Sequence, residues 1–561
     1  MNTLAPPLAS ISLALLVAAC GLTDPSSSAS SSGAGNAAQA AGTGGALSAA
    51  GSATAGAGTE AGGTLASGGE GGAPSSGGSA VAGGGAGGGA GAGGGSAGAA
   101  SVRPTQVVTS AEPLFWNPGT LSEVPSESPD VIVDDTTTYQ TFDGFGGTFN
   151  EKAWQYLSLL SESDRSKALN LLFGAEGARF VFGRLPIGAD EYASSRYTLD
   201  ITDSDTTPDL QMEKFSISRD LNDLIPFVKA ALALRPEMRF LAVPWTPPVW
   251  MKTGPFTGVS APSAYDGGQM KNDDQTLQAF ALYLSKFVQE YAKQGIDVEA
   301  IAIQREPSFA NAFPSCVWST ALYLEFVKNH LQPMFAAQGL NTKIYLGLME
   351  NGEETSMDTD LVSTVTERNH DTLEPFSGFG FQWGMLKQMD RVTSLNLPIL
   401  QTEHQPSNEP WKTPFYRDKA PNDFAYAVES WGLIRNWLEA GATAYIVKHM
   451  ALDRVGLGLD TRTHWPQNAL LVIDAATKAL TVTPTFYVFD HFSHFIVPGA
   501  KRIEVTSESL DALAFKNPDG SIVTVMYYNG SLSKPVTIAV GGVNYQFTMP
   551  GNGFATMYKS G

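Results

Sequence analysis

The chain has 561 residues, and 55 acidic against 35 basic side chains give it a formal charge of −20 at pH 7. A chain of this sign repels nucleic-acid backbones, so DNA and RNA are excluded as expected partners. Only two cysteines occur, Cys20 and Cys316, and no Cys/His spacing is typical of a zinc site, so the sequence predicts no zinc centre.

The chain begins with an apolar run, LASISLALLVAA, that ends directly before Cys20. This pattern resembles a bacterial lipoprotein signal peptide, in which small residues mark the cleavage site and the cysteine receives the lipid. We therefore expect residues 1–19 to be a signal peptide, Cys20 to be lipidated, and the exported protein to be held at the outer membrane or cell surface. A cleaved secretory signal with an incidental cysteine is the alternative, since no Lys or Arg precedes the run.

Residues 20–103 are dominated by Gly, Ala and Ser. Such a segment cannot bury enough apolar surface to offset its ordering entropy, so we predict a disordered linker. The linker would hold a folded body away from the membrane, which leaves the lipid anchor as the only expected membrane contact.

Helical and strand patterns alternate from residue 141 to 490. Within 274–294, apolar residues recur at three- and four-residue spacing, which predicts an amphipathic helix that Gly295 ends. The next units repeat this plan, with Gly339 and Gly441 as helix stops. Eight strands are predicted, at residues 142–147, 179–185, 239–245, 298–304, 343–349, 379–383, 398–403 and 442–450.

Eight strands that alternate with helices are typical of a closed (β/α)8 barrel, or TIM barrel, over residues 141–490. A doubly wound open sheet is the alternative α/β fold, although neither a GxGxxG motif nor a P-loop follows an early strand. Short alternating strands flank this region on both sides. We therefore predict that residues 104–140 and 491–561 together form one small β-sandwich.

Two glutamates follow predicted strands at the places where such barrels carry their chemistry. Glu306 comes just after the fourth strand and Glu403 ends the seventh, 97 residues later, which fits three βα units of about 31 residues each. A protonated and an ionised carboxylate about 5–5.5 Å apart suit glycoside hydrolysis with retention. For either glutamate alone, a loop salt bridge is the alternative interpretation.

Several longer stretches carry a more specific resemblance. They read YQTFDGFGGTFNEKAW (139–154), GRLPIGADEYASSRYTLD (183–200), FSISRDL (215–221), PWTPPVWMKT (244–253), QREPSFANAFPSCVW (304–318), ILQTE (399–403) and LTVTPTFYVFDHFSHFIVPGAKRI (480–503). In this order they resemble glycoside hydrolase family 30, which includes glucosylceramidases, endo-β-1,6-glucanases and some xylanases.

The resemblance implies a retaining β-glycosidase with a TIM barrel and a β-sandwich, needing no cofactor and no metal. Its implied substrates are β-linked oligosaccharides, polysaccharides or glycolipids. It also implies roles for four residues: Glu306 as acid/base, Glu403 as nucleophile, Trp245 in sugar stacking and Glu151 in contact with a substrate hydroxyl. Two further residues at predicted strand ends are candidates for substrate binding, Trp383 by stacking and Arg184 by holding a hydroxyl or a catalytic carboxylate, with a salt bridge as the alternative for Arg184.

Three residues depart from the pattern of the family. Arg305 replaces the usual Asn before the acid/base, and Lys448-His449 replace the usual Trp-Asn. One hypothesis is that these residues bind substrate and that Arg305 and Lys448 pair with a negative group such as a uronate; a repacked subsite is the alternative. A cation beside Glu306 lowers the pKa of that carboxyl, which opposes its role as an acid. A glycan-binding homologue without activity, or a displayed adhesion module, therefore remains the alternative to a hydrolase.

Overall fold

The computed structural model describes residues 103–125, 128–201, 206–257, 263–404, 409–410, 422–460, 463 and 465–561. The predicted signal peptide, the lipidation site Cys20 and nearly all of the predicted linker lie outside these residues. Within the described ranges, no helix has the length and apolar character that a membrane span requires.

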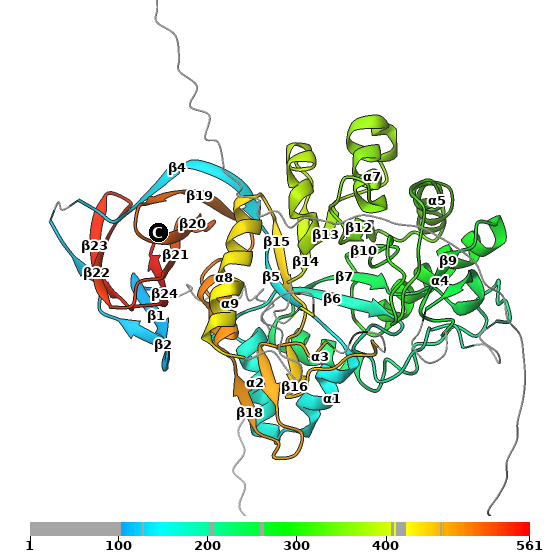
Figure 1. Cartoon of the computed structure of the whole chain (residues 1–561), viewed down its shortest axis with the longest axis horizontal. Helices are drawn as coiled ribbons and strands as arrows, with labels where there is room; N and C mark the ends of the chain where they lie inside the picture. Colours follow the sequence, from blue (N-terminus) through cyan, green and yellow to red (C-terminus); the bar gives the residue numbers. More distant parts are fainter. Residues whose placement is uncertain are drawn as a thin grey trace, which may run out of the picture. The chain divides into compact units, whose positions relative to one another are not determined.

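A parallel sheet forms the barrel (Figure 1). Its strands are β5 (Gly144–Thr148), β6 (Phe182–Ile187), β7 (Arg239–Pro244), β10 (Ala300–Ile301), β11 (Lys343–Ile344), β12 (Leu346–Met349), β13 (Phe379–Gln382), β14 (Ile399–Glu403) and β15 (Ala444–Val447). β11 and β12 are two halves of one strand, interrupted at Tyr345. Since β11 pairs with β10, β12 with β13 and β15 with β5, the sheet closes. The predicted eight-stranded barrel is confirmed, and an open sheet is ruled out.

Helices follow the strands as the sequence predicts. They are α1 (Glu151–Leu159), α2 (Glu162–Phe173), α3 (Leu224–Leu234), α4 (Asp274–Lys293), α5 (Thr320–Phe326), α6 (Gln332–Ala337), α7 (Met357–Ser363), α8 (Phe424–Glu439) and α9 (Pro484–Ser493). The 3-10 and π-helical segments are η1 (Val249–Met251), η2 (Val327–Leu331), η3 (Thr364–Arg368), η4 (His370–Thr372), η5 (Trp383–Arg391) and η6 (Thr393–Leu395). Gly295, Gly339 and Gly441 have positive φ angles of 79°, 65° and 104°. These glycines end their helices in a backbone conformation that glycine adopts at little cost.

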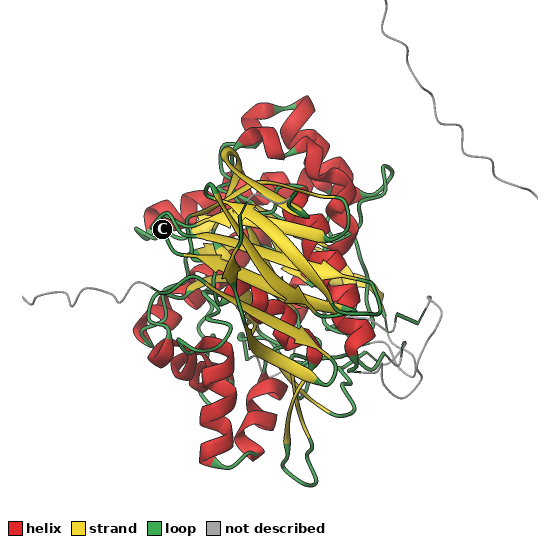
Figure 2. Cartoon of the chain, turned by 90° about the vertical axis from the view of Figure 1, so that its left-hand side faces the viewer, coloured by secondary structure: helices red, strands yellow, loops and turns green. Residues whose placement is uncertain are grey.

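A ten-stranded sheet built from both ends of the folded body forms the second part, and its strands face the viewer in Figure 2. They are β1 (Gln106–Ala111), β2 (Leu114–Gly119), β3 (Ser122–Glu123), β4 (Val131–Phe142), β19 (Ala500–Ser507), β20 (Asp511–Lys516), β21 (Ile522–Tyr528), β22 (Lys534–Val540), β23 (Val543–Met549) and β24 (Gly553–Lys559). The predicted sandwich from two chain ends is therefore confirmed. β2, β3 and β24 were not predicted.

α9 joins the two parts, because it contacts β5 of the barrel and both β2 and β24 of the sandwich. His491 on this helix hydrogen-bonds through its two ring nitrogens to the hydroxyls of Ser110 and Thr556, each at 2.9 Å. Two small sheets not predicted from the sequence border the barrel, namely β8 (Lys252–Phe256) with β9 (Gly267–Met270), and β16 (Ala451–Asp453), β17 (Leu471–Ile473) and β18 (Leu480–Val482).

Candidate active site

A cavity of about 430 Å³ lies at the C-terminal ends of the barrel strands. Charged side chains reach it directly from four strand ends: Glu306 after β10, Glu350 after β12, Glu403 at the end of β14 and Lys448 after β15. Five aromatic side chains also line the wall, namely Tyr192, Phe309, Phe313, Trp383 and Trp465. A cavity that combines aromatic faces with convergent carboxylates suits a polyhydroxylated ligand.

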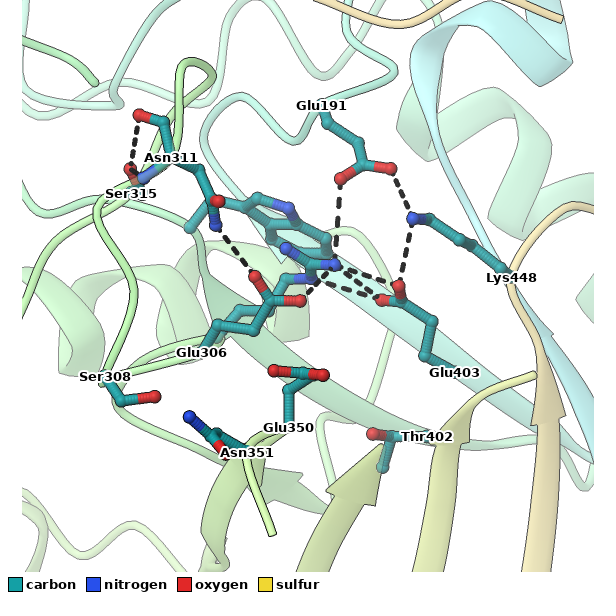
Figure 3. A network of polar contacts seen from close by, with 12 residues as sticks. Glu191, Glu306, Ser308, Asn311, Ser315, Glu350, Asn351, Thr402, Glu403 and Lys448 are labelled. Atoms are coloured by element: carbon teal, nitrogen blue, oxygen red, sulfur yellow. Dashed lines mark hydrogen bonds and ion pairs between the residues drawn. The ribbon is translucent and has the colours of Figure 1, made fainter. Parts of the chain in front are cut away.

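Glu306 and Glu403 face each other across this cavity (Figure 3). The Nη2 atom of Arg305 lies 2.7 Å from Oε1 of Glu306 and 2.9 Å from Oε1 of Glu403. The two carboxylate oxygens therefore cannot be farther apart than the sum of these distances, about 5.6 Å. This bound agrees with the separation of about 5–5.5 Å found in retaining glycosidases, and not with the wider spacing of inverting ones.

Glu306 is held in an unusual backbone conformation. Its φ angle is +50° although it precedes a proline, a combination that costs free energy and is met mainly at functional sites. Its N–H donates to the carbonyl of Leu348 at 2.8 Å, which ties the residue to the neighbouring strand β12. The amide of Asn311 donates to Oε2 of Glu306 at 2.8 Å. The strained turn and this amide together fix where the carboxyl points.

Burial decides the protonation of Glu306. It raises the pKa of this carboxyl to about 7, and the negative charges of Glu403 and Glu191 act in the same direction. The positive charge of Arg305 opposes the rise without cancelling it. Arg305 therefore lowers the pKa as expected, but burial outweighs this effect, so the pKa lies above its usual range.

Three cationic side chains contact the carboxylate of Glu403. Its carboxylate accepts from Nη1 of Arg184 at 2.9 Å and from Nε and Nη2 of Arg305 at distances of 2.9–3.1 Å. Nζ of Lys448 lies 2.9 Å from its Oε1. Burial by itself raises the pKa of Glu403, but these cations lower it well below its usual range. Glu403 is thus the ionised and Glu306 the protonatable member of the pair.

Glu191, which sequence reasoning missed, neutralises the two cations at the cavity wall. Its Oε1 lies 2.5 Å from Nζ of Lys448, and its Oε2 lies 3.7 Å from Nη2 of Arg305. It follows β6 by four residues, in a loop whose path no sequence pattern predicts.

Sequence reasoning also failed to identify Glu350 as a residue of the site. Its carboxyl points toward Glu306 and Glu403 in Figure 3 and makes no hydrogen bond or ion pair with the described part of the chain. Burial raises the pKa of this carboxyl to about 8, and the charge of Glu306 adds to the rise. It comes directly after the predicted strand 343–349, much as Glu306 comes just after the fourth predicted strand, so the same rule could have found it.

The structure brings some of the other predicted residues to the site. Trp383 lines the cavity. Arg184 is buried below it and holds the Glu403 carboxylate, as one of the two interpretations expects. The guanidinium carbons of Arg184 and Arg305 lie 5.1 and 5.3 Å from the centre of the Trp245 ring. Trp245 is 1% exposed and packs in the barrel interior, so it supports the cations and is not part of the cavity wall.

Glu151 and His449 do not reach the cavity. Both oxygens of Glu151 accept from Arg219, at 2.7 and 2.9 Å, and one also accepts from the N–H of Ser194. His449 is 2% exposed and pairs with Oε1 of Gln467 at 2.5 Å. Neither residue belongs to the cavity lining. The described residues also contain no cluster of His, Cys, Asp or Glu suited to hold a metal ion.

Comparison with known proteins places this site in a family. The sequence models of the glycosyl hydrolase family 30 TIM-barrel domain and β-sandwich domain match residues 142–364 and 499–557. Lysosomal acid glucosylceramidase of Mus musculus is 26% identical over 424 residues, which cover 72% of this chain and 77% of that enzyme. Endo-1,6-beta-D-glucanase of Neurospora crassa is 26% identical over 415 residues, or 71% of this chain and 81% of that one.

Among solved structures, SrfJ from Salmonella typhimurium has the same fold, with a TM-score of 0.70 and 23% identity over 82% of this chain and 99% of the other. Since the two family matches fall on the barrel and on the sandwich in the expected order, the chain belongs to glycoside hydrolase family 30.

Proposed function

We propose that the protein is a retaining β-glycoside hydrolase that cleaves β-linked glucosides in a polysaccharide or glycolipid. The observation that carries this proposal is the pair of carboxylates within about 5.6 Å of each other, one with a lowered and one with a raised pKa. The names of the relatives, a glucosylceramidase and an endo-1,6-glucanase, support glucose as the sugar.

In the proposed mechanism, Glu403 attacks the anomeric carbon and forms a covalent glycosyl-enzyme while Glu306 gives its proton to the departing oxygen. Glu306 then takes a proton from water, and the resulting hydroxide displaces Glu403. Two inversions at one carbon keep the β configuration. A pKa of about 7 lets Glu306 serve in both directions near neutral pH.

The contacts of the cations favour a neutral sugar over a uronate. Lys448 pairs with both Glu191 and Glu403, and Arg305 contacts these two and Glu306. A substrate anion would have to compete with carboxylates that already satisfy both side chains.

Variants of the two glutamates test the proposal. We expect Glu403→Ala to abolish hydrolysis of an aryl β-glucoside, because no nucleophile remains. Glu306→Ala should lower kcat on a substrate with a poor leaving group by about 10²–10⁴-fold, and added azide should then yield a β-glucosyl azide by attack on the glycosyl-enzyme.

The matched control is Glu299→Gln. Glu299 pairs with Arg239 and Lys343 at the opposite rim of the barrel, where these residues begin β7 and β11. Unchanged activity is expected for this variant. Full activity of either Glu306→Ala or Glu403→Ala would refute the assigned roles.

A further inference from the structure

The Glu403 carboxylate has its lone pairs fully engaged. Four nitrogen atoms contact it within 3.1 Å: Nη1 of Arg184, Nε and Nη2 of Arg305, and Nζ of Lys448. A carboxylate offers about four lone-pair sites. To attack an anomeric carbon it must direct one of them at that carbon, so at least one nitrogen has to withdraw before the reaction.

Arg305 is the donor whose position conflicts with the substrate. Its Nη2 lies between the carboxylates, 2.7 Å from Glu306 and 2.9 Å from Glu403. The anomeric carbon and the leaving oxygen must occupy this same space, since reacting atoms approach to about 3–3.5 Å. Arg305 also lines the cavity, whereas Arg184 is 1% exposed and does not.

A buried guanidinium cannot leave two carboxylates unless another anion receives it, because an unpaired buried charge is strongly destabilising. Glu191 supplies such an anion. Its Oε2 is 3.7 Å from Nη2 of Arg305, so a shift of about 1 Å brings the two to hydrogen-bond distance. Lys448 occupies the other oxygen of Glu191.

We propose that Glu191 is a positioning residue that receives the Arg305 guanidinium when a sugar enters the cavity, which frees Glu403 to attack. The inference rests on the proposed role of Glu403 as nucleophile. Trp245 and Phe313 support this movement, because their rings lie 5.3 and 5.5 Å from the guanidinium carbon and offer flat faces along which it slides.

The test uses a dinitrophenyl β-glucoside, whose leaving group departs without protonation, so that kcat/KM reports the attack by Glu403. Glu191→Gln keeps the shape of the side chain and removes its charge. We expect this change to lower kcat/KM by about tenfold or more, because Arg305 then stays on Glu403. In an Arg305→Asn background the same change should alter kcat/KM by less than about threefold.

Comparing the effect of Glu191→Gln in the two backgrounds distinguishes a role in positioning Arg305 from an effect on the stability of the protein alone. An equal loss from Glu191→Gln in both backgrounds, or no loss with Arg305 present, overturns the proposal. Glu191→Asp, which keeps a carboxylate, should recover part of the rate, and Glu299→Gln should leave it unchanged. Thermal unfolding checks that each variant folds. If the native enzyme itself fails to cleave the substrate, the proposed function is contradicted, which is a different result from a failure of this inference.

Discussion

At the scale of single residues, the protonation of the two glutamates depends on where the cations Arg184, Arg305 and Lys448 lie. Arg305 contacts Glu191, Glu306 and Glu403, and its charge lowers the pKa of Glu306 by less than burial raises it. The same cations act together on Glu403, whose pKa they lower. Two chemically identical side chains thus differ in protonation because of where their neighbours lie.

The raised pKa of Glu306 predicts the pH dependence of activity. The carboxyl is protonated below about pH 7 and loses its proton above it, so kcat/KM on an alkyl β-glucoside should fall as the pH rises through about 7. A dinitrophenyl β-glucoside needs no proton and should lack this decline. Rate measurements from pH about 5 to 9 on both substrates provide the check.

Glu350 is the control for that experiment, because burial raises its pKa to about 8. Glu350→Gln should keep the decline if Glu306 causes it. The same decline with both substrates would show that Glu306 does not act as the acid.

At the scale of elements, the eight barrel strands follow from hydrophobic patterns and glycine stops, and each predicted segment overlaps an observed strand. β24 could not be predicted in this way. It lies between β1 and β21, away from the edge of its sheet, and is buried at six of its seven residues, so the alternation that identifies half-exposed strands is missing. The three-residue strands β16–β18 depend on pairing between distant segments and leave no local pattern.

Gly146 tests the packing of the first barrel strands. In β5 it pairs with Phe182 of β6, and an added Cβ would lie 2.1 Å from the Phe182 carbonyl oxygen. Gly146→Ala should therefore lower the free energy of unfolding by about 1–3 kcal/mol or more. Chemical denaturation followed by circular dichroism measures this change.

Gly432 in α8 provides the contrast, because an added Cβ would meet nothing within 4 Å. Gly432→Ala should raise the free energy of unfolding by about 0.5–1 kcal/mol through helix propensity. If Gly146→Ala is as stable as the native protein, β5 and β6 do not pack as described.

At the scale of the whole molecule, the sequence alone predicts the barrel, the sandwich from both ends of the folded body and the two facing glutamates. Strand ends locate Glu306 and Glu403 because parallel strands bring their ends to one rim. Glu191 and Asn311 lie in loops whose course depends on tertiary contacts, so no pattern identified them. Residues such as Glu151, carried over by resemblance alone, lie outside the cavity because local partners hold them elsewhere.

The measurement that tests the central claim most directly is covalent trapping. A deoxyfluoro dinitrophenyl β-glucoside forms the glycosyl-enzyme but slows its hydrolysis, so the attacking residue stays labelled. Peptide mass spectrometry should find one sugar on Glu403 of the native enzyme. A label on any other side chain, or rapid turnover to the α-anomer without a label, would contradict the retaining mechanism.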